Sequence, residues 1–333
     1  MIRPPGINPK NPLVSVVTAV YNGEKYLDEC IESVLRQTYA TWEYLIVNNC
    51  STDKSVEIAQ GHARRDVRIR IVTNREHVGA IENHNIALNL ISPDSKYCKV
   101  VCADDWLFPE CIERMVTVAE QHPTVGIVGS YQLSGRYVKW MGFPYPEEVF
   151  SGRELCRRIF LGEDKTFGFG TPTSMLYRAD LVRKREAFYP NISAHADTSA
   201  CFKELQDSDF GFVYQVLSYE RIHEDTQSTK SVRINDYSSA YINDLLGYGP
   251  YYLTEEELAL KLSKAVSGYY EFLAANLLMA RGKAFWDYHR TRLKDLGFPI
   301  TPSRLLFAFM TKALRELRNP IQAFEKIQHR LVK

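Results

Sequence analysis

The sequence lacks the long apolar run that a membrane-spanning helix requires. No stretch of about 18 consecutive apolar residues occurs in it. Its first residues, Met1-Ile-Arg-Pro-Pro-Gly-Ile-Asn-Pro9, contain no apolar core of the kind that a signal peptide has. We therefore expect a protein of the cytoplasm with no segment that spans the membrane.

Cysteines are also few, and their spacing is irregular. The chain has 7 of them, an odd number, and no two form a Cys-x-x-Cys pair. They are Cys30, Cys50, Cys98, Cys102, Cys111, Cys156 and Cys201. This pattern predicts neither a disulfide framework nor a zinc site, and it indicates a reducing compartment.

A strong overall charge is absent as well. The formal net charge is +1, which argues against a nucleic acid as the partner. The charge is unevenly distributed, because residues 281–333 hold 12 Lys and Arg against 4 Asp and Glu, a net +8, so residues 1–280 carry −7. The 45% hydrophobic and 24% charged content is ordinary for a folded protein, and internal repeats are absent.

Short β-branched runs alternate with helical patterns over the first 120 residues. Strands are predicted at 13–20, 44–47, 69–72 and 97–102, with helices between them and a further helix at 110–121. Such alternation predicts an α/β fold, a doubly wound and mostly parallel sheet flanked by helices. The loops after the first, second and fourth strands should open at one sheet edge. They hold Tyr21, Asn48-Asn49 and Asp104-Asp105.

The second half of the chain is less regular. Residues 130–150 are predicted to be irregular, followed by helices near 151–161, 180–185 and 193–205 and by strands at 174–177 and 212–217. From Thr254, where Thr254 and Glu257 fit a capping box, the pattern is wholly helical. We predict one domain over 1–250 and a helical C-terminal extension over 251–333.

Two adjacent acids, Asp104 and Asp105, interrupt an apolar run at the end of the fourth strand. Neighbouring like charges at such a position are costly unless a cation or hydrogen-bond donors offset them. A divalent cation that carries a phosphorylated substrate would do so. The alternative is a solvated acidic cap on the helix that follows Pro109.

Several segments, in order, resemble family-2 glycosyltransferases of the GT-A fold. They are Val14-Ser-Val-Val-Thr-Ala-Val-Tyr-Asn-Gly-Glu-Lys-Tyr-Leu27, Ser33-Val-Leu-Arg-Gln-Thr-Tyr39, Asn49-Cys-Ser-Thr-Asp53, Ala103-Asp-Asp105 and Tyr219-Glu-Arg-Ile-His223. The resemblance implies inverting transfer of a sugar from a nucleoside diphosphate sugar to a hydroxyl of a saccharide or lipid-linked acceptor, with Mn²⁺ or Mg²⁺, in polysaccharide or glycoconjugate synthesis. It implies a nucleotide-binding half at about 13–120 and an acceptor half at about 121–250.

The resemblance also assigns roles to individual residues. Asp197 would be the catalytic base and Asp105, with His223, would hold the metal. The residues that would bind the nucleotide are Ala19, Tyr21, Asn49, Gly79, Asn85 and Asp104.

Other interpretations of these residues stay open. Tyr21 could be a core tyrosine, Asn49 could serve turn geometry, and Asp197 could cap a helix. The segment from Gly79 to Asn85 could be a loop and a helix cap, and His223 could be structural. Asp164 and Asp207 are rival bases.

The chain departs from the family pattern where acids or arginine are usual. Acids are replaced by Asn48-Asn49, Cys102 and Ala196, and the arginine is replaced by His84. The departures leave the base of the donor open between uridine, thymidine and guanosine. They also motivate a second hypothesis, a nucleotide-sugar-binding protein that has lost catalysis. A nucleotidyltransferase is a third, although Tyr21-Asn-Gly23 does not supply the Gly-rich phosphate loop that it needs.

The basic tail combines apolar and cationic residues. Its apolar residues include Leu305, Leu306, Phe307, Phe309, Met310, Ala313, Leu314, Leu317, Ile321 and Phe324, and its basic residues include Lys312, Arg315, Arg318, Lys326 and Arg330. A helix on an anionic membrane surface has this pattern. Packing on the catalytic domain, a dimer contact or a calmodulin-like partner would fit it equally.

Overall fold

The computed structural model describes residues 11–163, 168–190, 195–224, 226–277, 279 and 281–318. The chain forms two compact units, which divide between Thr229 and Lys230. The sequence analysis places the boundary near 250, but that position lies inside helix α9 (Asp236–Tyr252). The boundary was predicted where the pattern becomes wholly helical, at Thr254, but helix α9 precedes that point, and its Ile242 and Leu245 are fully buried.

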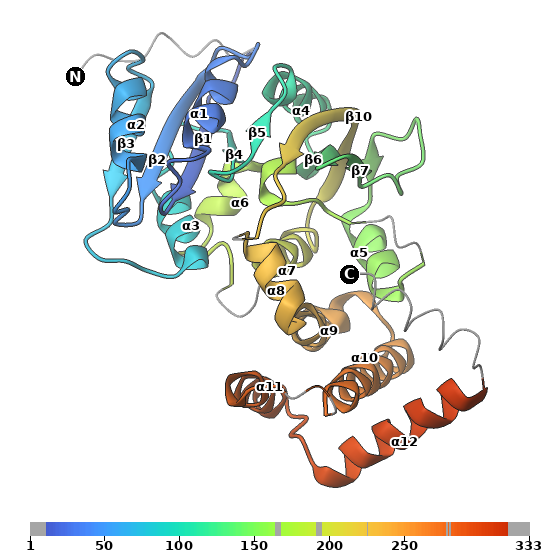
Figure 1. Ribbon diagram of the computed structural model, residues 1–333. Coiled ribbons are helices and arrows are strands. Elements are labelled where there is room, and N and C mark those ends of the chain that lie inside the picture. Colours follow the sequence, from blue (N-terminus) through green and yellow to red (C-terminus); the bar gives the residue numbers. More distant parts are fainter. Residues whose placement is uncertain are drawn as a thin grey trace. The chain divides into compact units, whose positions relative to one another are not determined.

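The first unit is built on one mixed sheet (Figure 1). Its first part contains β1 (Val14–Val20), β2 (Trp42–Asn48), β3 (Ile69–Thr73) and β4 (Tyr97–Val100), in the order β3-β2-β1-β4 and with every neighbour parallel. These are the four strands that the sequence predicts.

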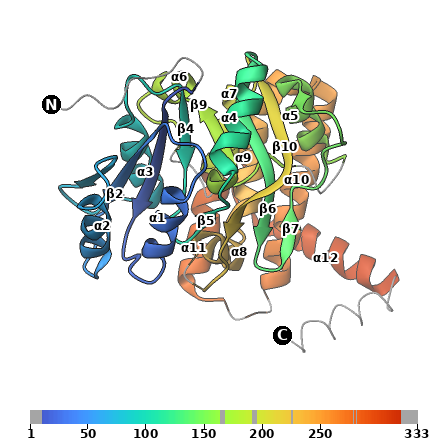
Figure 2. The same ribbon diagram turned by 90° about the horizontal axis from the view of Figure 1, so that it is seen from above.

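The sheet continues beyond β4 with β9 (Met175–Arg178), β6 (Val125–Ser134), β10 (Asp209–Glu220) and β5 (Trp106–Leu107). Strand β9 runs antiparallel to both β4 and β6, whereas β6 and β10 are parallel. The two ends of the sheet are visible from above in Figure 2.

Helices flank both faces of this sheet. On one face, Val14, Val16 and Val20 of β1 pack in a hydrophobic core with three helices. These helices are α1 (Leu27–Leu35), α2 (Ser55–Ala63) and α4 (Cys111–Gln121). Helix α3 (Ala80–Asn89) also contacts β1 but lies outside that core, so it covers the opposite face, together with α6 (Ala179–Arg183). The doubly wound arrangement predicted from the sequence is confirmed.

Residues 130–150 are more regular than predicted. Strand β6 runs on to Ser134, turns at Gly135 (φ +56°) and pairs with β7 (Tyr137–Lys139), and β8 (Val149–Phe150) pairs with β10. The prediction of an irregular segment was therefore wrong for the residues of β6, β7 and β8, whereas residues 140–148 contain no helix or strand. Helices α5 (Gly152–Leu161) and α7 (Ala196–Glu204) match the helices expected there.

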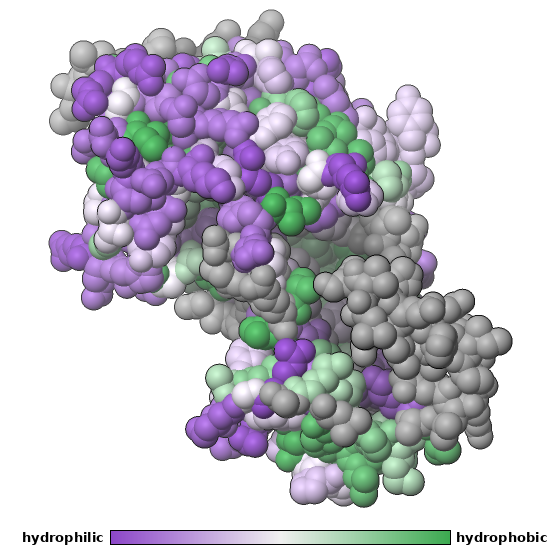
Figure 3. Space-filling model, in the orientation of Figure 1, coloured by the Kyte–Doolittle hydropathy of each residue, from purple (hydrophilic) through white to green (hydrophobic). Residues whose placement is uncertain are grey.

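The second unit is helical. After α8 (Gln227–Ile234) it consists of α9, α10 (Glu255–Asn276), α11 (Lys283–Asp295) and α12 (Pro302–Arg318). The capping box of Thr254 and Glu257 is confirmed, but helices begin at Gln227, well before Thr254. No helix among the described residues has the length and apolar character to cross a bilayer. Hydrophobic residues are exposed on this unit (Figure 3).

Candidate active site

The loops after β1, β2 and β4 meet at one edge of the sheet, as predicted. Val20 is in register with Asn48, and Val17 is in register with Val100. The backbone N–H of Asn49 donates to the carbonyl of Val20 at 2.8 Å. Because the three strands are parallel neighbours, their following residues form a common rim, which is where ligands bind in open α/β sheets.

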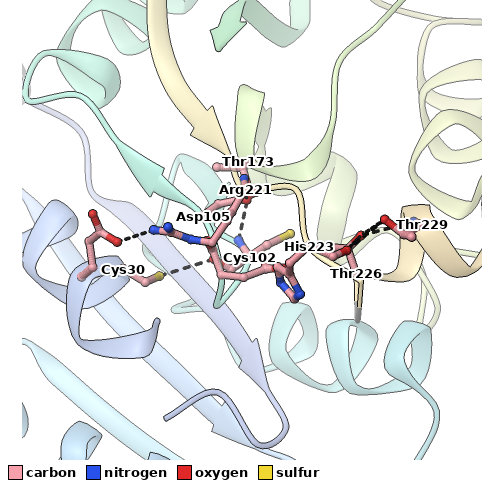
Figure 4. Close-up of polar contacts among 10 residues, drawn as sticks. Cys30, Cys102, Asp105, Thr173, Arg221, His223, Thr226 and Thr229 are labelled. Carbon is pink, nitrogen blue, oxygen red and sulfur yellow. Dashed lines mark hydrogen bonds and ion pairs between the residues drawn. The ribbon is translucent and has the colours of Figure 1, made fainter. Parts of the chain in front are cut away.

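Asp105 is the buried member of the acidic pair. Its carboxylate accepts hydrogen bonds from the Thr173 hydroxyl at 2.6 Å and from the Arg221 backbone N–H at 2.9 Å (Figure 4). Burial, together with the charge of Asp104, raises the pKa of Asp105 to about 8. Asp105 thus joins the ends of three segments that are far apart in the chain.

Thr173 is held by a buried lysine. Lys99, on β4, is fully buried, and its ammonium donates to the carbonyls of Thr173 at 2.5 Å and Met175 at 3.0 Å. Burial lowers the pKa of Lys99. The Thr173 hydroxyl also accepts from the backbone N–H of Cys102 at 3.1 Å. Sequence reasoning missed both residues, although a lysine inside the apolar run Tyr97–Val101 was a usable signal.

Asp104 is the accessible member of the pair. Its carboxylate lies 3.1 Å from Nε2 of His223, and both side chains are partly exposed. The carbonyl of His223 accepts hydrogen bonds from the hydroxyls of Thr226 at 3.1 Å and Thr229 at 3.0 Å, which fixes the segment after β10 (Figure 4). The sequence analysis groups His223 with Asp105, whereas the structure brings it to Asp104.

Arg221 fastens the acidic loop to α1. Its guanidinium donates to the backbone carbonyl of Asp104 at 3.0 Å and pairs with Glu29. The same group lies 4.3 Å from the centroid of the Tyr26 ring, and the Tyr26 and His223 rings are 5.2 Å apart. In the Tyr-x-Arg-x-His segment, Arg221 therefore positions the acidic loop, and His223 lies beside Asp104.

The Asp104 and His223 pair fits a divalent cation that also binds phosphate. A carboxylate oxygen and an imidazole nitrogen are both suitable ligands for Mn²⁺. Among the described residues, no three His, Cys, Asp or Glu side chains gather into a complete metal site. Phosphate oxygens and water would have to complete the coordination shell, as they do for a cation that binds with its nucleotide.

Three of the predicted nucleotide-binding residues present accessible surface near this rim. Tyr21 is 50% exposed and packs edge-on against His77, with ring centroids 4.5 Å apart, so it is not a core tyrosine. Ala19 is partly exposed on β1. Gly79 is exposed at the start of α3, where a Cβ would meet nothing within 4 Å.

Asn49 and Asn85 are instead buried and bonded to the protein's own backbone. The side chain of Asn49 accepts from the Val78 N–H at 2.9 Å and donates to the Val78 carbonyl at 2.8 Å. Asn85 makes the same pair of bonds to Tyr189, each 2.8 Å long. Both amides therefore shape the loops around the rim, in line with the turn-geometry interpretation of Asn49.

Asp197 lies in the first turn of α7, and its carboxylate accepts from the Thr198 N–H at 2.8 Å. Burial raises its pKa to about 6, and the negative charge of Glu220 contributes in the same direction. The charge of Glu220 also raises the pKa of Asp105. Of the rival bases, Asp207 is exposed and Asp164 lies outside the described residues.

A model of the family described as Glycosyl transferase family 2 matches residues 15–185, half of the chain. The chain belongs to this family. An uncharacterized glycosyltransferase of Haemophilus influenzae is 38% identical to it over 120 residues, which are 36% of this chain and 36% of that relative. The match thus spans only about a third of the length of this curated relative.

Solved glycosyltransferases share the fold of this family-2 chain. S. aureus TarS 1–349 in complex with UDP-GlcNAc superimposes with a TM-score of 0.63 at 16% identity, covering 95% of this chain and 92% of TarS. The mannosyltransferase PcManGT of Pyrobaculum calidifontis, in complex with GDP-Man and Mn²⁺, gives 0.53 at 15% identity, covering 91% and 87%. The fold is therefore GT-A, as the sequence predicts.

Proposed function

We propose that this protein transfers a sugar, with inversion, from a nucleoside diphosphate sugar to a hydroxyl of a saccharide or lipid-linked acceptor. The observation that carries the proposal is the accessible Asp104 and His223 pair at the carboxyl edge of β1, β2 and β4. Membership of family 2 supports it. We place the reaction in the cytoplasm and in the synthesis of a polysaccharide or glycoconjugate.

The donor nucleoside would lie on the accessible part of the rim. Tyr21 offers an aromatic ring for the base, and Ala19 and Gly79 let a ligand approach the backbone closely. Asn49 and Asn85 would act indirectly, by holding the loops at Val78 and Tyr189.

The diphosphate would lie beside Asp104 and His223. A bound Mn²⁺ or Mg²⁺ would neutralise charge that develops on the leaving diphosphate. Asp104 and His223 would hold it, while Arg221 and Asp105 keep the Asp104 loop in place. This proposal moves the metal from Asp105, where the sequence analysis expects it, to Asp104, because both Asp105 oxygens are engaged within the protein.

Asp197 would take the proton of the acceptor hydroxyl as its oxygen attacks the anomeric carbon. Attack opposite the departing diphosphate inverts the anomeric centre. A base works best when its pKa lies near the pH of the reaction, and burial brings the pKa of Asp197 to about 6.

Thermal unfolding with UDP, dTDP and GDP, each with and without Mn²⁺, tests the proposal. One nucleotide should raise the unfolding temperature, and more so with Mn²⁺, because a ligand selective for the folded state stabilises it. Hydrolysis of the matching nucleotide sugar should follow. Binding without turnover of any donor sugar would instead support the binding protein that has lost catalysis, and no shift with any nucleotide would contradict both.

A further inference from the structure

Helix α12 uses only one narrow side to pack within the C-terminal unit. Ala308 is 6% exposed and packs with Tyr270 and Ala274 of α10, and Leu305 packs beside it. Residues 305, 308 and 312 recur at helical spacing and face this seam. Of the apolar residues of α12, Leu305 and Ala308 pack in this seam.

The opposite side of α12, here called the outer face, is apolar and exposed. Leu306, Phe307, Met310 and Leu314 have exposed fractions of 59%, 72%, 54% and 55%. Scattered single apolar residues are common on surfaces, but four within nine positions on one side of a helix form a patch, and such patches mark interaction sites. Packing within the unit, the plainest interpretation of the tail, therefore leaves the outer face unexplained.

The positive charge of α12 indicates which kind of partner would bind the outer face. Its 17 residues include four Lys or Arg and one Glu, a net charge of +3. On the helical projection Arg304 falls between the outer face and the seam, at a border of the apolar surface, whereas Lys312 lies on the seam side. In a two-fold dimer the same patch meets itself, so like charges would face each other. An anionic headgroup layer complements them instead.

A groove beside α12 also combines apolar side chains with a cation. It lies between α10 and α12, has a volume of about 830 Å³ and is mostly apolar. Its lining includes Leu262, Val266, Tyr270, Phe298 and Phe307, with Arg304 among the polar residues. An apolar slot with a cation beside it fits an acyl chain with an anionic headgroup.

We propose that the outer face of α12 binds an anionic phospholipid surface, with its apolar side chains in the interface and Arg304 against the headgroups. This inference goes beyond the proposed sugar transfer and does not depend on it.

Flotation of the full-length protein tests the proposal. It should float with vesicles made of equal parts phosphatidylcholine and phosphatidylglycerol, but not with phosphatidylcholine alone, and salt of about 0.5 M should weaken the association by screening. The triple variant Phe307→Ser, Met310→Ser, Leu314→Ser should bind at least about tenfold more weakly, because apolar burial drives insertion. These three side chains are exposed, so the fold should persist.

A matched control separates the outer face from general surface hydrophobicity. Val67→Ser, Met141→Ser and Leu260→Ser remove three other exposed apolar side chains and should leave flotation unchanged. Equal flotation of the outer-face variant and wild type would overturn the proposal. So would a wild type that fails to float on anionic vesicles but forms a dimer that the outer-face variant abolishes, which would identify a second copy as the partner.

Discussion

At the scale of residues, the two acids of the Asp104-Asp105 pair have different surroundings although they are neighbours. Asp105 is 5% exposed and engaged by Thr173 and Arg221, whereas Asp104 is accessible and faces His223. Burial and the charge of Asp104 raise the pKa of Asp105, and both of its oxygens accept hydrogen bonds within the protein. The difference between the two acids can be measured.

We expect Asp104→Asn to weaken Mn²⁺ binding, measured by titration calorimetry with saturating nucleoside diphosphate, by at least about tenfold, since even outer partners of metal ligands have effects of that size. His223→Gln should weaken it similarly. Asp105→Asn is the control, because Asn keeps the uncharged form of the side chain, and metal affinity should change little. Loss of Mn²⁺ binding in Asp105→Asn alone would return the metal to Asp105.

Asp197 leads to a prediction about pH. If it is the base, the rate of sugar transfer at low donor concentration should fall about tenfold per pH unit below about 6, where its carboxyl becomes protonated. The charge of Glu220 also raises the pKa of this carboxyl, and the charge of Asp197 in turn raises the pKa of Tyr177, Tyr189 and Cys201. Transfer that is constant between pH 5 and pH 8 would exclude Asp197 as the base.

Asp197→Asn should abolish transfer and yet stabilise the protein. The folded pKa of Asp197 is raised above its unfolded value, so the ionised form costs stability, and that cost develops as pH rises from about 4 through about 6, reaching at most about 3 kcal/mol. Asn cannot ionise, so the variant should unfold at higher temperature than wild type at pH 8 but not at pH 4. Asp207→Asn, at an exposed carboxyl, should change neither property.

At the scale of elements, the short helix η1 (Pro172–Ser174) connects the buried lysine on β4 to the acidic loop. Strand β9 follows it directly and runs antiparallel between two parallel parts of the sheet. Lys99 satisfies one carbonyl from each of these elements. The lysine therefore stabilises the place where the sheet changes direction and where Thr173 meets Asp105.

We predict that Lys99→Met lowers the free energy of unfolding by about 1–3 kcal/mol, because it leaves buried carbonyls without a donor. Denaturant unfolding would measure this. Lys96→Met, three residues earlier, removes a half-exposed lysine paired with Glu120 and should cost less than about 1 kcal/mol. Equal effects of the two substitutions would show that the carbonyl contacts of Lys99 contribute little.

The contrast between sequence and structure is clearest at this scale. The short β-branched runs and the helical patterns were enough to predict β1 to β4 and their shared edge, because β1, β2 and β4 are almost wholly buried. The β6–β7 hairpin escaped prediction because Tyr137 and Val138 are exposed and give no burial pattern. Asn49 and Asn85 were assigned to the ligand because one sequence does not show that their amides bind Val78 and Tyr189.

At the scale of the whole molecule, the chain joins a family-2 catalytic unit to a helical unit that the family match does not reach, since that match ends at residue 185. The excess of basic residues lies within the helical unit, from Arg281 onward. Sequence alone identified this basic, apolar tail but could not tell packed from exposed apolar residues. The structure separates Ala308, which is buried, from Phe307, which is 72% exposed.

The contact between Asp104 and His223 joins residues that are 119 positions apart in the chain. Asp105 and the Arg221 backbone are separated by 116. On a ribosome, the strands that carry the nucleotide rim would emerge and pair well before the end of β10 exists. A nascent chain that stops before Arg221 would therefore have a nucleotide rim without its metal pair. If Asp104 and His223 hold the metal of the donor as proposed, metal-assisted donor binding requires that the last strand of the sheet has been synthesised and paired.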